Sequence, residues 1–227
     1  MTSQPHLLTM EELLSKLKSN KVIKTDKVYK AMQSVDRSDF IQNDPFDDCP
    51  QRIGFNTTIS APHMHAFALE YLAPVLKEND RVMDVGSGTG YLTLALSKVM
   101  NDKGLVVGVE HIKEFCDLSK YNIMKKNANL LDNGKIIIEC GDGRLGYEKY
   151  APYKCIHVGA AAEEIPKSLI NQLDNGGRMF IPVGKLNSEQ VILLVDKDKK
   201  GKVTETELMS VRYGSLTSVE EQKNRFK

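Results

Sequence analysis

Two stretches near the N-terminus repeat apolar residues at the spacing of one helix face. The first follows Thr9 and Glu12, which have the spacing of a capping box, and the second follows Thr25 or Asp26, either of which can cap a helix. The positions on one face are Leu13, Leu14 and Leu17 in the first stretch and Val28, Ala31, Met32 and Val35 in the second. The pattern predicts two short amphipathic helices.

From residue 62 onward, short apolar runs alternate with helical patterns. Pro62 is suited to the first turn of a helix that runs to about Leu76. The predicted strands are 81–85, 105–110, 136–140, 154–158 and 178–183, and the helices between them are 91–100, 112–129 and 165–173. This alternation is typical of βαβ units and a parallel sheet. Two further apolar runs, 191–195 and 203–209, flank a Lys-Lys-Gly-Lys turn and predict an antiparallel hairpin.

We therefore predict an α/β fold: a Rossmann-like, doubly wound and mostly parallel sheet with a C-terminal antiparallel hairpin and an N-terminal helical cap. A length of 227 residues suits one domain. We divide it into N-terminal helices with a covering loop (1–60), a core (61–212) and a tail (213–227). Residues 36–60 have no clear periodicity but carry several large apolar side chains, so this segment either packs over the core or covers a site.

Composition narrows the class of protein. Lys plus Arg is 31 and Asp plus Glu is 30, a net charge of +1, which argues against a partner bound through many phosphates. No apolar run approaches the ~18 residues that span a bilayer. The cysteines lie far apart without a Cys-x-x-Cys pair, so we expect reduced thiols in a cytoplasmic protein and no metal site. They are Cys49, Cys116, Cys140 and Cys155.

A glycine-rich turn, 84–90, follows the first strand of the core, where open α/β sheets bind ligands. Its Gly-x-Gly-x-Gly pattern differs from a dinucleotide fingerprint, and no lysine follows as in a P-loop. Asp84 would repel phosphates and suits a cationic nucleoside ligand such as S-adenosylmethionine. Glu110 ends the second strand, where a carboxylate accepts ribose hydroxyls, and Asp142 follows the third, within reach of an adenine amine. Each carboxylate alone is typical of a solvated strand end, but together they predict that cofactor.

Motifs that the sequence lacks narrow the range of possible methyl acceptors. Residues 43–46 come close to the Asn/Asp-Pro-Pro-aromatic motif of base N-methylation, but one proline and a leading strand are missing, so we predict a turn. No Ser-His-Asp or Cys-His constellation follows from the spacing. An amine or alcohol acceptor usually needs a base to remove its proton, whereas a carboxylate is already ionised at neutral pH.

Five blocks of the sequence, in order, are similar to protein-L-isoaspartate O-methyltransferases. They are 57–66, 84–90, 141–144, 157–161 and 182–184. The resemblance implies a repair enzyme that moves the methyl of S-adenosylmethionine to the free α-carboxylate of an L-isoaspartyl residue in damaged proteins and peptides. S-adenosylhomocysteine is then the product. The ester closes to a succinimide without the enzyme, and hydrolysis returns some aspartate.

The resemblance also implies roles for single residues. The family's active-site serine falls on Ser60, and we interpret its hydroxyl as the group that holds the acceptor carboxylate; capping the helix that begins near Pro62 is the other interpretation. The implied cofactor contacts are Thr57, Thr58, Ile59, Ser60, His65, Asp84, Gly86, Ser87, Gly88, Gly90, Glu110, His111, Asp142, Gly143, Thr217 and Gln222. The implied substrate contacts are Ser60, Val158, Gly159, Ala160 and Val183. Glu110 stands where familiar animal members carry Asp, and the tail lacks their tryptophans.

Two other functions remain open. A small-molecule O- or N-methyltransferase would use the same cofactor site, but the block around Ser60 would then have no role. A non-catalytic binding module would not need the intact Asp84, Gly86, Gly88 and Glu110. We expect no metal, no nucleic-acid partner and no membrane partner, and we expect a cytoplasmic monomer.

Overall fold

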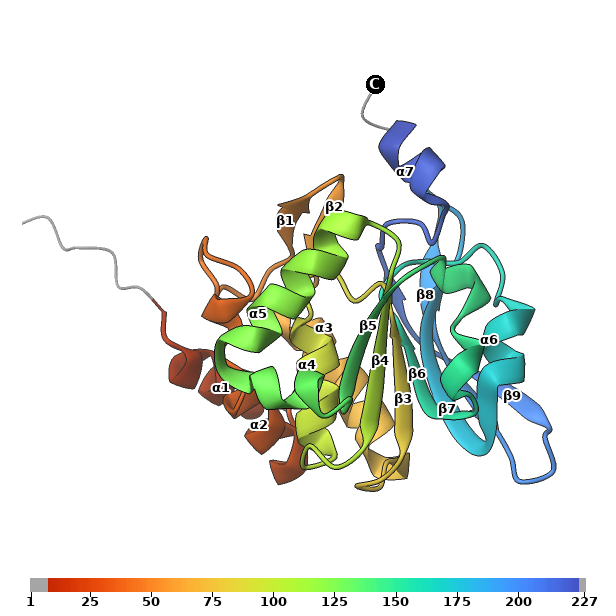
Figure 1. Cartoon of the computed structure of the whole chain (residues 1–227), viewed down its shortest axis with the longest axis horizontal. Helices are drawn as coiled ribbons and strands as arrows, with labels where there is room; N and C mark the ends of the chain where they lie inside the picture. The colour runs from red at the N-terminus through yellow and green to blue at the C-terminus, as the bar shows by residue number, and fades with distance from the viewer. Residues whose placement is uncertain (1–7, 225–227) are drawn as a thin grey trace, which may run out of the picture.

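The computed structural model describes residues 8–224, and a seven-stranded sheet forms its centre (Figure 1). The strands are β3 (Arg81–Val85), β4 (Leu105–Glu110), β5 (Ile136–Cys140), β6 (Tyr153–Val158), β7 (Leu173–Val183), β8 (Gln190–Lys197) and β9 (Val203–Val211). Their order in the sheet is β5-β4-β3-β6-β7-β8-β9. The five strands from β5 to β7 are parallel, whereas β8 and β9 are antiparallel additions at one edge. The predicted α/β fold class is confirmed.

Helices cover both faces of this sheet. Figure 1 shows α1 to α5 on one side and α6 on the other. The helices are α1 (Met10–Ser19), α2 (Asp26–Gln33), α3 (Pro62–Leu72), α4 (Tyr91–Val99), α5 (Lys113–Asp132), α6 (Lys167–Gln172) and α7 (Val219–Asn224). The short 3₁₀ turns are η1 (Arg37–Asp39), η2 (Ala73–Val75), η3 (Gly143–Leu145) and η4 (Glu148–Tyr150). No helix in the described part of the chain is long and apolar enough to cross a membrane.

Two hydrophobic cores lie on opposite faces of the sheet. Consecutive strand residues alternate between them, since Val82 joins the core under α1 to α5 and Met83 joins the core under α6. Val106 and Val107 of β4 divide in the same way. Strands buried on both faces are apolar at most positions, as expected for a parallel sheet. The two cores hold the carboxyl ends of β3, β4 and β6 at fixed positions.

The opening helices form as predicted. Thr9 and Glu12 make a reciprocal capping box, with Glu12 N donating to Thr9 Oγ1 at 3.2 Å and Thr9 N donating to Glu12 Oε2 at 2.8 Å. Thr25, rather than Asp26, caps α2 by accepting from Val28 N. Helix α2 then contacts both α3 and α4. The predicted N-terminal helical cap is therefore packed on the helices beside the sheet.

The segment 36–60 contains more regular structure than its sequence predicts. It holds η1 and a two-stranded hairpin, β1 (Gln51–Gly54) with β2 (Thr57–Ile59). The turn of this hairpin is Phe55-Asn56, both at positive φ, which a non-glycine pair does not signal in a sequence. The segment is thus a folded cover, which we group with the tail 213–224 as the covering layer.

Two predicted boundaries are wrong. The helix predicted to reach Leu76 ends at Leu72, because η2 contains Pro74 and tightens into a 3₁₀ turn. The helix predicted over 165–173 is only Lys167–Gln172, and β7 starts at Leu173 instead of residue 178. A shift in the β6–β7 register between Tyr153 and Cys155 accommodates the additional strand residues.

Candidate active site

The glycine-rich turn connects β3 to α4 at the carboxyl end of the sheet. Gly86 has a φ of +78° and its N–H donates to the carbonyl of Val109 at 2.8 Å. Gly90 caps α4 in the left-handed region, and a Cβ there would lie 3.0 Å from Cβ of Ser119. Glycine at both positions lets the chain turn against the neighbouring strand and helix. The turn therefore lies directly beside the end of β4.

Glu110 ends β4 and is fixed by backbone donors. Its Oε2 accepts from Gly88 N at 3.0 Å and its Oε1 accepts from Ile112 N at 2.9 Å, with 6% of the residue exposed. A carboxylate oxygen can accept more than one hydrogen bond, so each retains capacity for a ribose hydroxyl. The predicted carboxylate is thus held in one orientation at the wall of a cavity.

This cavity of about 600 Å³ lies over the carboxyl ends of β3, β4 and β6. The predicted site residues that line it are Thr57, Thr58, Ser60, Gly86, Gly88, Glu110, His111, Gly143, Gly159, Ala160, Thr217 and Gln222. The hydroxyl of Thr217 is buried there with no hydrogen-bond partner in the described residues. Buried polar groups normally have partners, so this hydroxyl fits a bound polar ligand such as a nucleoside.

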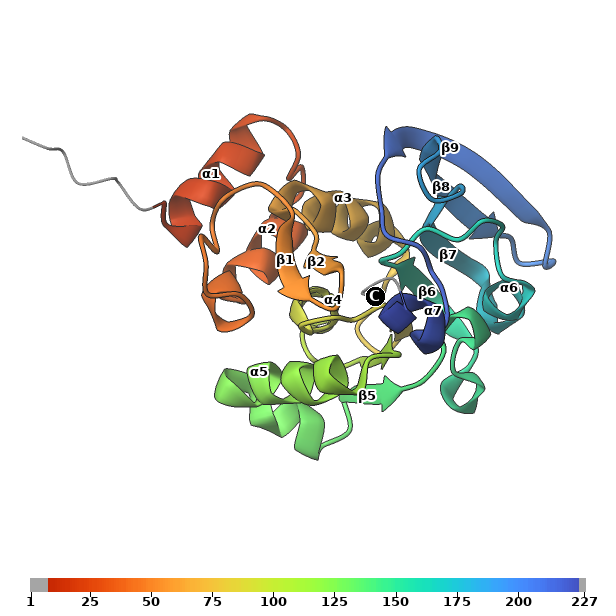
Figure 2. The same ribbon diagram turned by 90° about the horizontal axis from the view of Figure 1, so that it is seen from above.

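The covering layer closes the cavity from above. In Figure 2 the β1–β2 hairpin and α7 lie over the same end of the sheet. They meet where Gln222 Nε2 donates to the carbonyl of Phe55 at 2.8 Å. The Phe55 ring also packs edge-on against Phe115 of α5, with ring centroids 5.5 Å apart. These contacts join three segments that are far apart in the sequence.

A second cavity of about 40 Å³ lies beneath the glycine turn. It is lined by four predicted residues that do not line the larger cavity. They are Ile59, His65, Asp84 and Ser87, and Ser60 lines both cavities. Asp84 is only 1% exposed, and both of its oxygens have partners. His157 Nδ1 donates to Oδ1 at 2.8 Å, and Thr93 Oγ1 donates to Oδ2 at 2.6 Å. Asp84 thus braces the turn and does not line the larger cavity.

Ser60 does not cap α3. The N-cap position is Ala61, which has no side chain able to cap, so the capping interpretation is wrong. The Ser60 carbonyl accepts from Arg37 at 2.8 Å, while its side chain lies beside the Tyr213 hydroxyl. Burial raises the pKa of Tyr213 to about 12, against a lowering effect of the hydrogen bond with Ser60, so the phenol is neutral at pH 7. Two hydroxyls therefore meet in the cavity.

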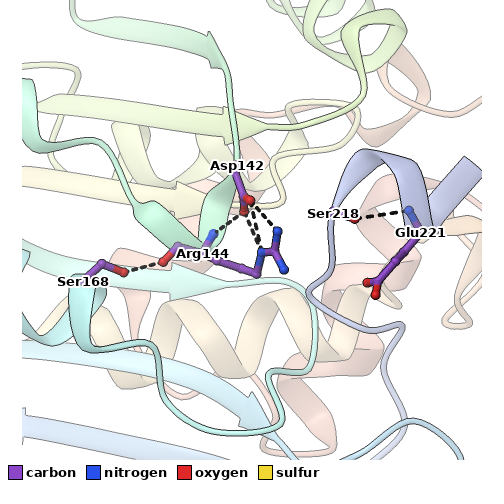
Figure 3. Close-up of polar contacts among 5 residues, drawn as sticks. All are labelled: Asp142, Arg144, Ser168, Ser218 and Glu221. Atoms are coloured by element: carbon purple, nitrogen blue, oxygen red, sulfur yellow. Dashed lines mark hydrogen bonds and ion pairs between the residues drawn. The ribbon is translucent and has the colours of Figure 1, made fainter.

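Asp142 is occupied by its neighbour Arg144, as Figure 3 shows. Arg144 Nε lies 3.0 Å from Oδ1 and Nη2 lies 2.6 Å from Oδ2, and these hydrogen bonds lower the pKa of Asp142. The carbonyl of Arg144 accepts from the hydroxyl of Ser168. On the other side the charge of Glu221 in α7 acts on Arg144, and the N–H of Glu221 is bound by Ser218 Oγ at 3.2 Å. Asp142 therefore already has a cationic partner within the described residues.

Four predicted residues line neither cavity. They are Gly90, Asp142, Val158 and Val183. The side chain of Val158 is completely buried, because it points into the core on the face of the sheet that α6 covers. That side chain therefore cannot contact a substrate. Val183 pairs with Ala162 through an isolated bridge beside the tail.

Sequence reasoning missed Arg37, Phe115 and Tyr213. Arg37 is completely buried and touches His65 and Ser60, and Phe115 and Tyr213 line the larger cavity. Arg37 lies in a segment without periodicity, and Tyr213 follows the last strand with no motif around it. Phe115 belongs to an ordinary helix pattern. Their roles arise from contacts over long sequence separations, for which a single sequence carries no signal.

The fold, the glycine turn and the fixed carboxylate at the end of β4 are those of an S-adenosylmethionine-dependent methyltransferase. A crystal structure of a protein-L-isoaspartate O-methyltransferase from Plasmodium falciparum, in complex with S-adenosyl-L-homocysteine, matches with a TM-score of 0.86 and 34% identity, covering 92% of this chain and 99% of that one. The family model for protein-L-isoaspartate(D-aspartate) O-methyltransferase matches residues 8–221. The chain belongs to this family.

Two curated relatives show how much of the chain the likeness covers. The protein-L-isoaspartate O-methyltransferase of Caenorhabditis elegans is 47% identical over 217 residues, which are 96% of each chain. Protein-L-isoaspartate O-methyltransferase 1 of Arabidopsis thaliana is 46% identical over 92% of each chain. The likeness therefore includes the covering layer as well as the sheet.

Proposed function

We propose that this enzyme methylates the free α-carboxylate of L-isoaspartyl residues in damaged proteins and peptides, using S-adenosylmethionine. The methyl ester then closes to a succinimide, and hydrolysis returns part of the damaged residue to aspartate. The observation that carries the proposal is the position of Ser60. It lines both cavities, directly beside the glycine turn, and its hydroxyl is not used to cap a helix.

The residues around the larger cavity are suited to hold the cofactor. Glu110 would accept the ribose hydroxyls, and the unpartnered hydroxyl of Thr217 would gain a hydrogen bond. Gly86 and Gly88 have no side chains to obstruct a close approach. When bound, S-adenosylmethionine supplies an electrophilic methyl group on a positively charged sulfur. The chain itself has to orient that group toward an acceptor and keep water away.

Ser60 and Tyr213 are suited to hold the acceptor. Both hydroxyls can donate to a carboxylate, which needs no base because it is ionised at neutral pH. Alignment of acceptor and donor in a closed site accounts for much of the rate enhancement in such transfers. The contact between Gln222 and Phe55 supports closure, because it brings the tail across to the hairpin above the cavity. No general base is required from the chain.

We further propose that the chain acts as a single domain and as a cytoplasmic monomer that does not bind nucleic acid. The net charge of +1 supports the last point. The four cysteines are free thiols, which suits a reducing compartment. Size-exclusion chromatography with light scattering would test the oligomeric state, and a mass near the 25.4 kDa of one chain is expected.

The activity is tested with methyl-labelled S-adenosylmethionine and two matched peptides, one with L-isoaspartate and one with L-aspartate at the same position. We expect base-labile label on the isoaspartyl peptide alone. Label on both peptides would contradict the selectivity. Label on neither peptide, with the cofactor still bound, would contradict the repair activity and favour a small-molecule acceptor or a binding role.

A further inference from the structure

Arg37 is an arginine buried completely inside the protein. It lies in η1 and its exposed fraction is 0%. Its Nη2 donates to the carbonyl of Ser60 at 2.8 Å, and its Nη1 lies 3.2 Å from Nδ1 of His65. The guanidinium also lies over the Tyr91 ring, 5.2 Å from the centroid. Because arginine carries no acceptor, His65 Nδ1 must accept, which fixes the neutral tautomer of that imidazole.

The charge of Arg37 has no carboxylate partner within the described residues. Among residues 8–224, each ion pair of an arginine or lysine involves a residue other than Arg37, and Arg37 Nε has no hydrogen-bond partner. Asp48, whose charge acts on Arg37, and Asp36, the preceding residue, both accept hydrogen bonds from other residues. Asp36 accepts from the hydroxyl of Ser38 at 2.6 Å, and Asp48 accepts from Nδ1 of His63 at 2.8 Å. A buried charge without a partner is costly, so its retention calls for a compensating role.

The compensating anion has a natural source in the reaction. Arg37 contacts the peptide of Ser60 from behind, and the side chain of Ser60 lies on the cavity side next to Tyr213. An acceptor carboxylate held by Ser60 would be separated from the guanidinium by little more than that peptide unit. In a buried environment of low dielectric constant, opposite charges at such a separation attract strongly.

We propose that Arg37 is a positioning residue for the acceptor: it fixes the Ser60 peptide and supplies the positive charge that the acceptor carboxylate neutralises on binding. This inference rests on the proposed function. It also separates substrate from product, because methylation removes the charge of the carboxylate and with it the attraction to Arg37. The neutral ester is therefore held less tightly than the acid from which it formed.

The variant Arg37→Met tests the charge at nearly constant length. We expect KM for an isoaspartyl peptide to rise about tenfold or more. The Kd of S-adenosylhomocysteine, which is neutral at sulfur, should stay within about twofold of wild type. Binding of S-adenosylmethionine should be unchanged or tighter, since a repelling cation is gone. Arg37→Lys keeps a charge and a donor and should restore most of the lost affinity for the peptide.

A matched control is Arg178→Met. Arg178 is a partly buried arginine in β7 that lines neither cavity, with Nε 2.7 Å from Asp196 Oδ1 and Nη1 3.1 Å from the carbonyl of Tyr71. It should lower thermal stability without changing KM for the peptide. If Arg37→Met does not fold, Arg37→Gln, which keeps a donor toward Ser60, replaces it with the same expected rise in KM.

Two results would overturn the inference. One is an unchanged KM in Arg37→Met or Arg37→Gln; the other is an equal loss of affinity for peptide and S-adenosylhomocysteine, which indicates a purely structural arginine. Both require a wild-type enzyme that methylates the isoaspartyl peptide. A wild type that methylates no isoaspartyl peptide would instead contradict the proposed function itself, so the two failures are distinguishable.

Discussion

The carboxyl ends of β3 and β4, which we call the sheet edge, and the covering layer contribute to the same cavity, but different interactions hold them in place. At the sheet edge, Asp84 and Glu110 are each fixed by two short hydrogen bonds, on strands buried between two cores. In the covering layer, bonds from a side chain to a backbone carbonyl, such as Gln222 to Phe55 and Arg37 to Ser60, join distant segments. We therefore propose that the cofactor is held mainly by the rigid end of the sheet, and that the acceptor meets a surface assembled from separate segments. Mutations at the sheet edge should mainly change stability and cofactor affinity, and a mutation at Ser60 should mainly change turnover.

The largest effect on stability is expected at Asp84, which binds Thr93 and His157 beneath the glycine turn. Asp84→Ala leaves His157 Nδ1 and the Thr93 hydroxyl buried without their acceptor, which should lower the free energy of unfolding by about 3 kcal/mol. Asp84→Asn can still accept from His157 and donate to Thr93, so it should recover much of the loss. Thermal denaturation of both variants is the measurement. Equal stability of wild type and Asp84→Ala would show that the carboxylate does not brace the turn.

A somewhat smaller effect is expected at Glu110, the part of the sheet edge that faces the cavity. In Glu110→Gln one side-chain oxygen becomes an NH₂ group that cannot accept from Gly88 N or Ile112 N. We expect the affinity for S-adenosylhomocysteine to fall by about 2 kcal/mol, measured by calorimetry. Glu139→Gln on the neighbouring strand, whose residue does not line the cavity, is the control. The prediction fails when both variants bind alike.

The junction between the two regions should be sensitive to pH through His65. Burial, followed by the charges of Arg37, His157 and His63, lowers the pKa of His65 well below 6.5. The unfolded chain therefore takes up a proton at a higher pH than the folded chain. This group's stabilising contribution is complete above pH 6.5 and is lost as the pH falls toward the folded pKa, by up to about 1.4 kcal/mol per pH unit. Urea unfolding at pH 7.5 and 5.5 should show a smaller pH-dependent loss in His65→Gln than in wild type.

The smallest effect is expected in the covering layer at Gln222. Gln222→Ala removes the bond to the Phe55 carbonyl and should weaken binding of S-adenosylhomocysteine by about 1 kcal/mol, mainly through faster dissociation. The exposed neighbour Lys223→Ala provides the control. The measurement is the stopped-flow dissociation rate of S-adenosylhomocysteine from both variants and wild type. An unaltered rate in Gln222→Ala would mean that the tail does not close the cavity.

The same division explains what the sequence could predict. Parallel strands place their carboxyl ends at one edge, so the glycine turn and Glu110 could be brought together from strand order alone. The partners of Asp84 could not, because Thr93 and His157 are 9 and 73 residues away in the chain. Asp84 is consequently a brace for the turn rather than a group facing the large cavity.

In the covering layer, local patterns carry little information. The hairpin over 51–59 turns at Phe55-Asn56, and its glycine, Gly54, lies before this pair, so the Asn-Gly signal of a two-residue hairpin turn is missing. Arg37 looks like a surface residue in a polar stretch, and its burial depends on contacts with α3 and α4.

Outside the covering layer, the end of α6 at Gln172 also depends on a distant contact. Strand β7 begins there because it pairs with β6, which no local signal in 165–173 indicates.

The measurement that tests this account most directly compares Ser60→Ala with wild type in two assays, kcat/KM for an isoaspartyl peptide and Kd for S-adenosylhomocysteine. We predict a loss of about a hundredfold in kcat/KM, as for removal of one oriented hydrogen-bond donor, with Kd within about twofold. Ser38→Ala, whose hydroxyl binds Asp36 outside the cavity, should change neither. Equal, small losses in both assays for Ser60→Ala would contradict an acceptor site at the junction of the sheet edge and the covering layer.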